Sequence, residues 1–228
     1  MTATPEPEVF TKAFKIRGNI VVGCVTALAF FGPIVLGIGG AVALKGTLGD
    51  GGAAIAGLGG FALAVAGFIV ASQKAVLIGN QGLRRDLAAA LQRRFGRNPD
   101  DGTAYFVGWS PGRGLNTKDG DTDHDVGFLT LTPEALNFLG DTVGFEVQRQ
   151  QVRWVGPAQQ GVPFLMDFGL RIAVYWVDAW GNENAFTFER REGRSRRQVR
   201  RRNRELAEIL QQWHQYGTVA DPAGQVRA

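Results

Sequence analysis

The sequence predicts an α+β protein in two parts: a pair of membrane-spanning helices near the N-terminus, then a β-rich domain that ends in an amphipathic helix. Two apolar stretches contain no charged residue, one between Arg17 and Lys45 and the other between Asp50 and Lys74. Each exceeds the ~20 residues that an α-helix needs to cross a hydrocarbon core. After Gly102, apolar residues recur at alternate positions, which is typical of β-strands.

Composition and turn signals divide the chain into five segments. The formal charge of +4 is small, but arginines cluster after the second apolar stretch and again at 190–204. The predicted segments are a cytoplasmic tail at 1–17, a transmembrane hairpin at 18–73 with spans at about 18–44 and 52–72, a basic helix beside the membrane at 74–98, a β domain with its C-terminal helix at 99–216, and a tail at 217–228.

Small residues recur at every fourth position of the second apolar stretch, at Ala56, Gly60 and Ala64. Such a stripe lets two helix backbones approach closely. We expect the two spans to pack on each other through it, and small-residue faces could also pair two copies of the chain in a homo-oligomer. The single cysteine, Cys24, lies in the first stretch, so the chain can form no internal disulfide.

The placement of lysine and arginine predicts the orientation of the hairpin. The connecting loop carries only Lys45, whereas basic residues flank both outer ends: Lys12, Lys15, Arg17, Lys74, Arg84, Arg85, Arg93, Arg94 and Arg97. By the positive-inside rule, both termini face the cytoplasm, and we expect a multi-pass protein of the cell inner (plasma) membrane. A cleaved signal peptide is the alternative, because residues 41–43 resemble a cleavage site. The apolar run, however, is longer than the usual run of about 7–15 residues.

Residues 81–95 have the apolar spacing of a short helix, which Gly96 and the Asn-Pro pair at 98–99 would end. Four arginines are interleaved with its apolar positions: Arg84, Arg85, Arg93 and Arg94. Beside an anionic leaflet, each such charge is worth about 1 kcal/mol. They are therefore candidate lipid- or partner-binding residues, although they could instead only enforce the topology.

Short alternating stretches joined by turn residues predict antiparallel strands. The stretches are 104–109, 126–132, 136–138, 143–147 and 171–178, with a hairpin turn at 181–182 that leads to Phe186 and Phe188. A final helix is predicted at 196–214, capped by Ser195. Its apolar face can close the sheet, and the opposite face carries the remaining candidate lipid or partner contacts: Arg197, Arg200, Arg201 and Arg204. Because positive charge is disfavoured at a helix N-terminus, these arginines favour an anionic partner.

Residues 127–138 read GFLTLTPEALNF, a Gly-x-Leu-x-Leu-Thr strand, a turn and a Leu-x-Phe strand. With 145–155 and the C-terminal helix, this order resembles GRAM and bacterial PH-like domains over roughly 104–216. The resemblance implies a PH-like antiparallel β-barrel or sheet capped by the helix, and a domain that binds lipid headgroups or protein segments. The loop at 110–125 departs from the pattern, because it holds four aspartates beside Arg113 and Lys118. Phosphoinositide recognition is therefore not expected.

Aspartates alternate along that loop and are its weak candidates for a metal site: Asp119, Asp121, Asp123 and Asp125. A calcium loop needs glycine at its sixth position and a bidentate glutamate at its twelfth, where this chain has His124 and Thr130. We therefore expect no bound metal, and a solvated turn whose aspartates bond the local backbone.

No catalytic constellation is evident in the sequence. The only histidines are His124 and His214, and Cys24 is predicted to lie in lipid, so no Cys–His pair is available. His214 falls at a helix end, where a cation suits the dipole. We expect a non-catalytic binding or scaffolding module without a cofactor, docked on anionic lipid or a protein partner, and nucleic acid is not an expected partner. The alternative is an accessory subunit of a membrane enzyme or transport complex.

Overall fold

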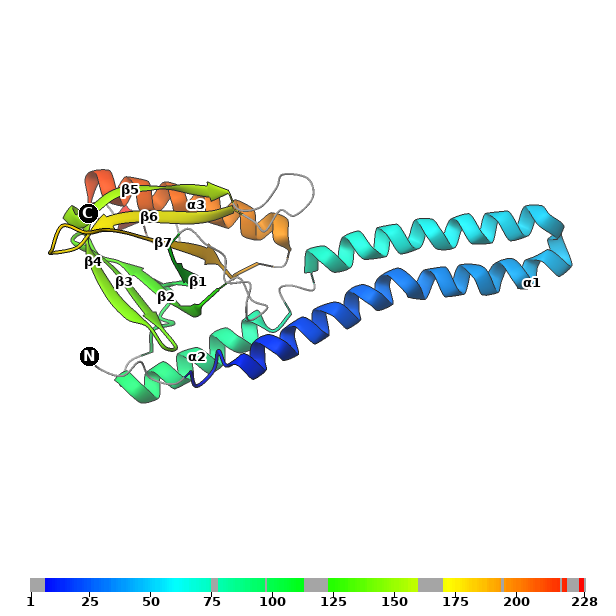
Figure 1. Ribbon diagram of the computed structural model, residues 1–228, viewed down its shortest axis with the longest axis horizontal. Helices are drawn as coiled ribbons and strands as arrows, with labels where there is room; N and C mark the ends of the chain where they lie inside the picture. The colour runs from blue at the N-terminus through cyan, green and yellow to red at the C-terminus, as the bar shows by residue number, and fades with distance from the viewer. Residues whose placement is uncertain are drawn as a thin grey trace. The chain divides into compact units, whose positions relative to one another are not determined.

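The computed structural model describes residues 7–74, 78–96, 98–112, 123–159, 170–193, 195–217, 219–220 and 226–227 (Figure 1). The chain forms two compact units. Arg17–Ile78 make up one unit, here called the hairpin unit, and Met1–Ile16 with Gly79–Ala228 make up the other, here called the β unit.

The hairpin unit consists of most of α1 (Lys12–Lys74), a helix broken at Gly49. Gly49 has φ 69°, a left-handed conformation that glycine adopts without steric cost, and this residue reverses the chain. The two arms, Lys12–Thr47 and Gly49–Ala71, are each long and apolar enough to span a membrane. The predicted pair of long apolar helices is therefore confirmed, with a tighter turn than the one expected at 45–51.

Small residues bring the two arms into close backbone contact. A Cβ atom added to Gly60 would lie 2.6 Å from the Cα atom of Gly37 and 2.8 Å from the carbonyl oxygen of Pro33. Ala64, one turn further along, is fully buried. The expected packing of the spans through this stripe is confirmed, whereas the pairing of two copies stays a prediction.

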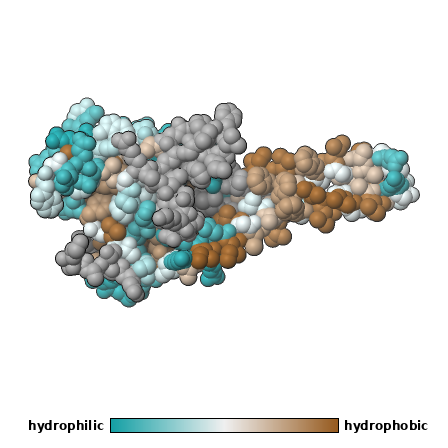
Figure 2. All heavy atoms as spheres, viewed as in Figure 1, coloured by the Kyte–Doolittle hydropathy of each residue, from teal (hydrophilic) through white to brown (hydrophobic). Residues whose placement is uncertain are grey.

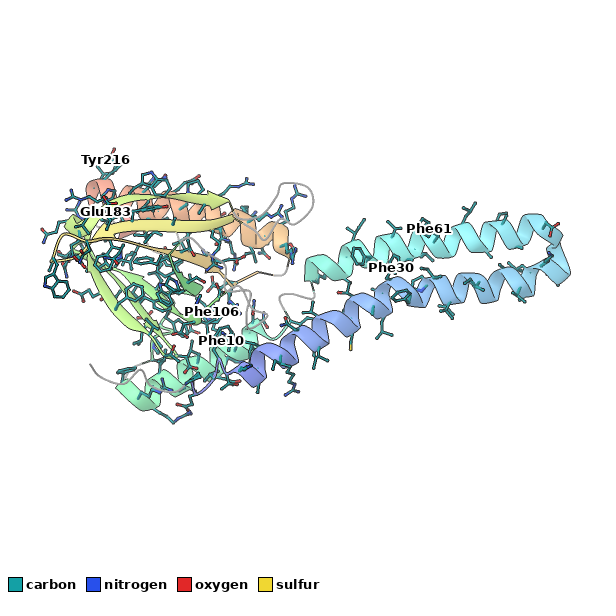
Figure 3. All side chains as sticks on the ribbon, in the orientation of Figure 1. Phe10, Phe30, Phe61, Phe106, Glu183 and Tyr216 are labelled. Carbon is teal, nitrogen blue, oxygen red and sulfur yellow. The ribbon has the colours of Figure 1, made fainter. Side chains whose placement is uncertain are left out.

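Large apolar side chains of the hairpin unit point outward. Leu28, Leu36 and Ile55 are each about three-quarters exposed, and apolar residues cover most of the surface of this segment (Figure 2). Among its aromatic residues, Phe30 packs edge-on against Phe68, with ring centroids 5.7 Å apart. Phe61, on the second arm, is exposed (Figure 3).

The β unit is an open, antiparallel, seven-stranded sheet with one helix on each face. The strands follow the order β4-β3-β2-β1-β7-β6-β5. The elements are α2 (Asn80–Phe95), β1 (Tyr105–Pro111), β2 (Asp125–Leu131), β3 (Ala135–Gly140), β4 (Gly144–Gln148), a 3-10 turn (Arg149–Gln151), β5 (Val152–Gln159), β6 (Leu170–Val177), β7 (Glu183–Arg190) and α3 (Arg196–Tyr216). The predicted strands and both predicted helices are present. A separate two-stranded pair, β8 (Val219–Ala220) with β9 (Val226–Arg227), lies where only a tail was expected.

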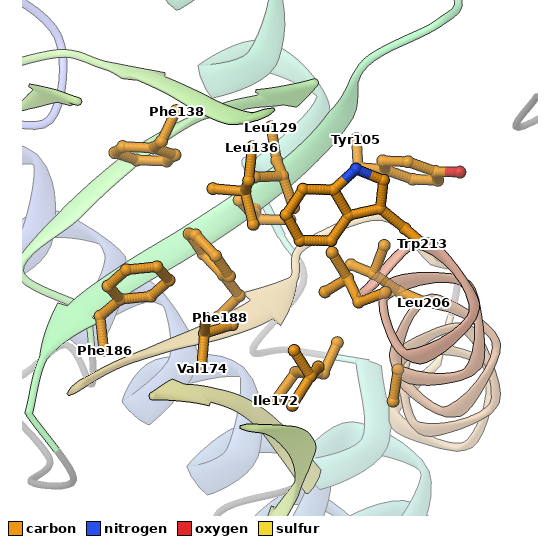
Figure 4. Close-up of a cluster of buried hydrophobic side chains, with 14 of the residues drawn as sticks. Tyr105, Leu129, Leu136, Phe138, Ile172, Val174, Phe186, Phe188, Leu206 and Trp213 are labelled. Carbon is orange, nitrogen blue, oxygen red and sulfur yellow. The ribbon is translucent and has the colours of Figure 1, made fainter. Parts of the chain in front are cut away.

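One face of the sheet, here called the inner face, packs against α3 and forms the larger core (Figure 4). Leu206, Leu210 and Trp213 of α3 meet the aliphatic and aromatic side chains of all seven strands. The Trp213 indole donates a hydrogen bond to the carbonyl oxygen of Thr132 at 2.6 Å. As expected, the Ser195 hydroxyl caps α3 by accepting the amide of Gln198 at 3.3 Å.

The opposite face of the sheet packs against α2 and the segment before α1. Leu83, Leu87 and Leu91 of α2 are buried with Phe106 and Phe128 of the sheet, and Phe10 joins this second core. The segment at 9–10 is also hydrogen-bonded to the β unit. The carboxylate of Asp141 accepts the amides of Val9 and Phe10, each at 2.8 Å.

These contacts change two expectations. The residues at 9–15 are part of a packed unit and not a free tail, because Phe10 buries its ring and Asp141 satisfies the backbone there. α2 was assigned to a segment separate from the β domain, whereas its apolar stripe covers the sheet of the β unit. A position of α2 beside the membrane stays a prediction. One aromatic residue in a polar stretch carries no periodic signal, which is why the sequence did not reveal the contact.

Candidate functional site

The exposed face of α3 carries arginines, as predicted. Arg197, Arg201 and Arg204 are exposed, Arg200 is half-buried, and the opposite face is buried in the core. Arg201 forms an exposed ion pair with Glu205, 3.3 Å between the charged atoms. Arg197 and Arg204 form no ion pair with any residue that the structure describes. This stripe therefore presents positive charge to solvent.

The arginines of α2 have a different environment. Arg84 contacts the carboxylates of Asp100 and Glu192, both at 2.5 Å, and its hydrogen bond to Asp100 raises the pKa of the guanidinium. The half-buried Arg94 donates to the carbonyl oxygen of Asp141 at 2.5 Å.

The acidic partner of the last turn of α2 is Glu8. Arg93 and Arg94 both pair with its carboxylate, and the hydrogen bond from Arg93 lowers the pKa of Glu8. Arg85 alone of the four candidates is exposed without an ion pair among the described residues. Three of the four therefore have ion-pair partners in their own chain, part-buried for Arg84 and Arg94 and exposed for Arg93.

A glutamate that the sequence analysis did not single out connects these two sets of arginines. Glu192 follows β7 and contacts Arg84 of α2, Arg190, and Arg202 of α3, the last at 3.7 Å. The arginine-rich stretch at 190–204 is thus partly neutralised within the β unit. Arg197 and Arg204 have no ion-pair partner among the described residues, and the pair of Arg201 with Glu205 is exposed, so these three arginines remain accessible to a partner.

At the described end of the acidic loop, Asp123 and Asp125 are buried and not solvated as was expected. Asp123 is 1% exposed and lies 2.7 Å from both Arg171 and Arg191. Arg171 is itself fully buried, and its Nε atom donates to the Thr187 hydroxyl at 3.1 Å. Burial is possible because each charge has an opposite partner, which offsets much of the cost of desolvation.

Asp125 has a structural role in the turn after β3. Its carboxylate accepts the amides of Thr142 and Val143 at 2.9 and 2.8 Å, and burial raises its pKa. Asp119 and Asp121 lie outside the described residues. Within the described part of the chain, no group of three or more His, Cys, Asp or Glu side chains could hold a metal ion.

The surroundings of His214 oppose the positive charge that the C-terminal end of a helix would favour. Desolvation, and then the positive charge of Arg149, lower its pKa, so the neutral imidazole is favoured. Arg149 reaches the C-terminal end of α3 instead, where it donates to the carbonyl oxygen of His214 at 3.4 Å.

A concave site on β5, β6 and β7 was not anticipated. It has a volume of about 430 Å³ and is lined by Arg153, Trp154, Tyr175, Trp176, Val177, Glu183 and Asn184. The Trp154 indole lies over Gly156, where a Cβ atom would come within 2.3 Å of the ring, and it meets Tyr175 edge-on at 5.3 Å. The sequence does contain the aromatic residues Trp154 and Tyr175, but that they are paired on neighbouring strands and face away from the core follows only from the strand register.

Comparison of the chain with protein-family models, with curated proteins and with solved structures gave no match. The function must therefore be argued from the site residues themselves.

Proposed function

We propose that this chain is a membrane-anchored, non-catalytic binding module whose β unit docks on anionic lipid through the exposed arginines of α3. The anchor is supported by two apolar arms of membrane-spanning length that direct leucine and isoleucine side chains outward. The basic residues flanking the hairpin favour an inner-membrane location with both termini in the cytoplasm.

A PH-like identity for the β unit is part of the proposal. The GFLTLTPEALNF motif forms β2, a turn and β3, a strand–turn–strand unit that supports the resemblance, although β1 precedes it in the chain. Seven antiparallel strands followed by one amphipathic helix are also the expected element order. PH-like domains act through binding, which favours a docking function for this unit.

The exposed arginine stripe of α3 carries the proposal. Arg197, Arg201 and Arg204 lie on the solvent side of a helix whose other side is core, so their side chains can reach a partner without unfolding. The first turn of α3, which contains Arg197, has no acidic residue, and only Arg201 of the three has an ion-pair partner among the described residues, the exposed Glu205. An anionic headgroup would compensate these charges.

Docking can be tested with the full chain in lipid nanodiscs. A fluorophore is attached to a cysteine that replaces Gln215, in a Cys24→Ala background so that only this site is labelled. It should be quenched by headgroup-labelled lipid in anionic discs and not in zwitterionic discs. The combined change of Arg197, Arg201 and Arg204 to Glu, or high salt, should abolish the quenching. Lys45→Glu, a charge reversal beside the turn of the hairpin unit, is the control and should leave it unchanged. Equal quenching in both kinds of disc would refute lipid docking through this stripe.

A second candidate function, an accessory subunit of a membrane complex, is favoured by the outer surface of the hairpin unit. Gly57 and Gly59 have no described atom within 4 Å of an added Cβ position, so another helix could approach closely there. Purification of the tagged chain from native membranes in mild detergent would support this function if a membrane protein came with it in stoichiometric amount.

A further inference from the structure

The concave site on β5, β6 and β7 combines aromatic walls with one cationic and one anionic side chain. Arg153 and Glu183 both line it, both are exposed, and neither forms an ion pair with a described residue. Elsewhere in the β unit, acidic side chains such as Asp123 and Glu192 pair with arginines. Two opposite charges at one site, without an ion pair between them, leave an anionic and a cationic position open to a ligand.

The local backbone structure sets the directions of the Arg153 and Glu183 side chains. The β5–β6 ladder shifts register between Val152 and Trp154, which leaves Arg153 at an irregularity in the strand. Bulges of this kind redirect a side chain and are frequent beside binding sites. Glu183 pairs with Val177 at the start of β7, just beyond the turn between β6 and β7, so its carboxylate is placed by a two-strand ladder.

The aromatic walls are held in place before any ligand binds. Trp154 is 46% exposed although its ring lies against Gly156 and Tyr175, so part of the indole is open to solvent. Indole and phenol rings attract a cation that lies within about 6 Å of the ring centre. A nearby carboxylate strengthens the attraction, and Glu183 supplies one at this site.

The guanidinium of Arg153 suits the other end of such a ligand. Arginine binds phosphate through paired N–H donors that match the geometry of the oxygens. A volume of about 430 Å³ is within the range of small-molecule sites. A ligand that matches the whole site therefore has an alkylated ammonium and a phosphate a few bonds apart.

We propose that this concave site binds an ammonium–phosphate zwitterion of the phosphocholine type, with the ammonium against Trp154, Tyr175 and Glu183 and the phosphate at Arg153. The site lies apart from the arginine stripe of α3, and the proposal does not depend on docking through that stripe. The same chemistry occurs in a lipid headgroup and in the free phosphoester, which the experiment separates.

The test uses the full chain in a maltoside detergent, which has no charged headgroup. Saturation-transfer NMR on the N-methyl protons of added phosphocholine should show saturable binding. Arg153→Gln should weaken binding about tenfold, the loss expected for one charged hydrogen bond to the phosphate. Glu183→Gln should also weaken binding about tenfold, because it removes the carboxylate that attracts the quaternary ammonium, a group with no N–H to donate. Trp154→Leu should abolish the transfer from the aromatic wall.

The matched control is Trp180→Leu. Trp180 lies in the same β6–β7 turn region and is 86% exposed, but it does not line the site. This variant should bind phosphocholine like the unaltered chain, and thermal unfolding would confirm that all four variants fold. If Trp154→Leu does not fold, the two exposed charge variants, Glu183→Gln and Arg153→Gln, decide the outcome.

Three results would overturn the proposal: no saturable transfer, equal loss with Trp180→Leu and Trp154→Leu, or competition by choline alone or inorganic phosphate alone as strong as by phosphocholine. Nanodiscs identify the source of the ligand. Displacement of free phosphocholine by discs containing phosphatidylcholine, and not by discs of phosphatidylglycerol alone, indicates a lipid headgroup. Binding that neither disc displaces indicates the free phosphoester.

Discussion

The two units of this protein place their side chains in opposite ways. In the hairpin unit, glycine and alanine lie inside, as at Gly60 and Ala64, and leucine and isoleucine lie outside. In the β unit, aromatic and aliphatic residues such as Phe188 and Trp213 lie inside, and arginines such as Arg197 and Arg204 lie outside. Helices in lipid gain nothing by hiding apolar side chains from each other and associate through close backbone contact, whereas a unit in water is stabilised by apolar burial. The contrast supports the proposed membrane anchor.

The units also differ in how they handle charge. Among the described residues of the hairpin unit, one exposed ion pair lies beside the turn, Lys45 with Asp50 at 3.3 Å. The β unit buries Arg171 and Asp123 together at 2.7 Å. The stability of the β unit therefore depends on specific pairs of residues far apart in sequence, whereas that of the hairpin unit depends on composition and on the spacing of small residues. Four substitutions test this comparison.

The largest effect is expected from Trp213→Ala. The indole is fully buried between α3 and the sheet and donates a hydrogen bond to Thr132. Because the substitution removes both the packing and this bond, the free energy of unfolding should fall by about 3–5 kcal/mol. Thermal or chemical unfolding of the full chain in detergent, followed by near-ultraviolet circular dichroism, measures this change. Tyr216→Ala, which truncates a 73% exposed ring of the same helix, should stay within about 0.5 kcal/mol. Equal effects of the two would contradict the core assigned to α3.

Asp123→Asn should lower the free energy of unfolding by nearly as much. It leaves the buried guanidinium of Arg171 without its closest carboxylate, a type of change that costs about 3–5 kcal/mol. The same substitution in the hairpin unit, Asp50→Asn, should have no measurable effect because its pair is exposed. If both variants unfold like the unaltered protein, the buried ion pair is not a structural requirement.

Gly60→Leu should weaken the hairpin unit by about 1–3 kcal/mol, because a side chain there collides with Gly37 and Pro33 of the other arm. Gly59→Leu is the matched control, since its added side chain meets no described atom within 4 Å and the change in helix propensity is the same. Titration with dodecyl sulfate in mixed micelles compares the two variants. A larger loss at position 59 than at 60 would refute the packing through the small-residue stripe.

The smallest effect concerns pH. The pKa of His214 is lowered in the folded protein, so near that pKa the unfolded chain binds more protons than the folded protein does. The free energy of unfolding should therefore be at its full value above about pH 6.5 and decline as the pH falls through the ordinary titration range of histidine. His214→Gln should flatten that decline in unfolding measurements between about pH 7 and 5. A steeper decline in the variant would show that the folded protein favours the imidazolium.

Much of the fold was predictable from local patterns. The lack of charge in the two apolar stretches, the alternation at 126–132, the Ser195 cap and the amphipathic spacing of α3 each depend on residues close together in the chain. The exposed arginines of α3 were predictable for the same reason. The role of the α2 arginines was not, because Arg84 finds Glu192 across 108 positions of sequence.

Local sequence specifies which stretches avoid water, which others alternate between apolar and polar residues, and which helix face is basic, because each residue's preference for solvent acts locally. The three-dimensional packing is needed to show that Phe10 joins a core, that Asp123 is buried between Arg171 and Arg191, and that Arg153 and Glu183 share one concave site. Those outcomes depend on strand register and on contacts between distant segments. No local pattern encodes them, since the free energy of each contact exists only once both partners are in place.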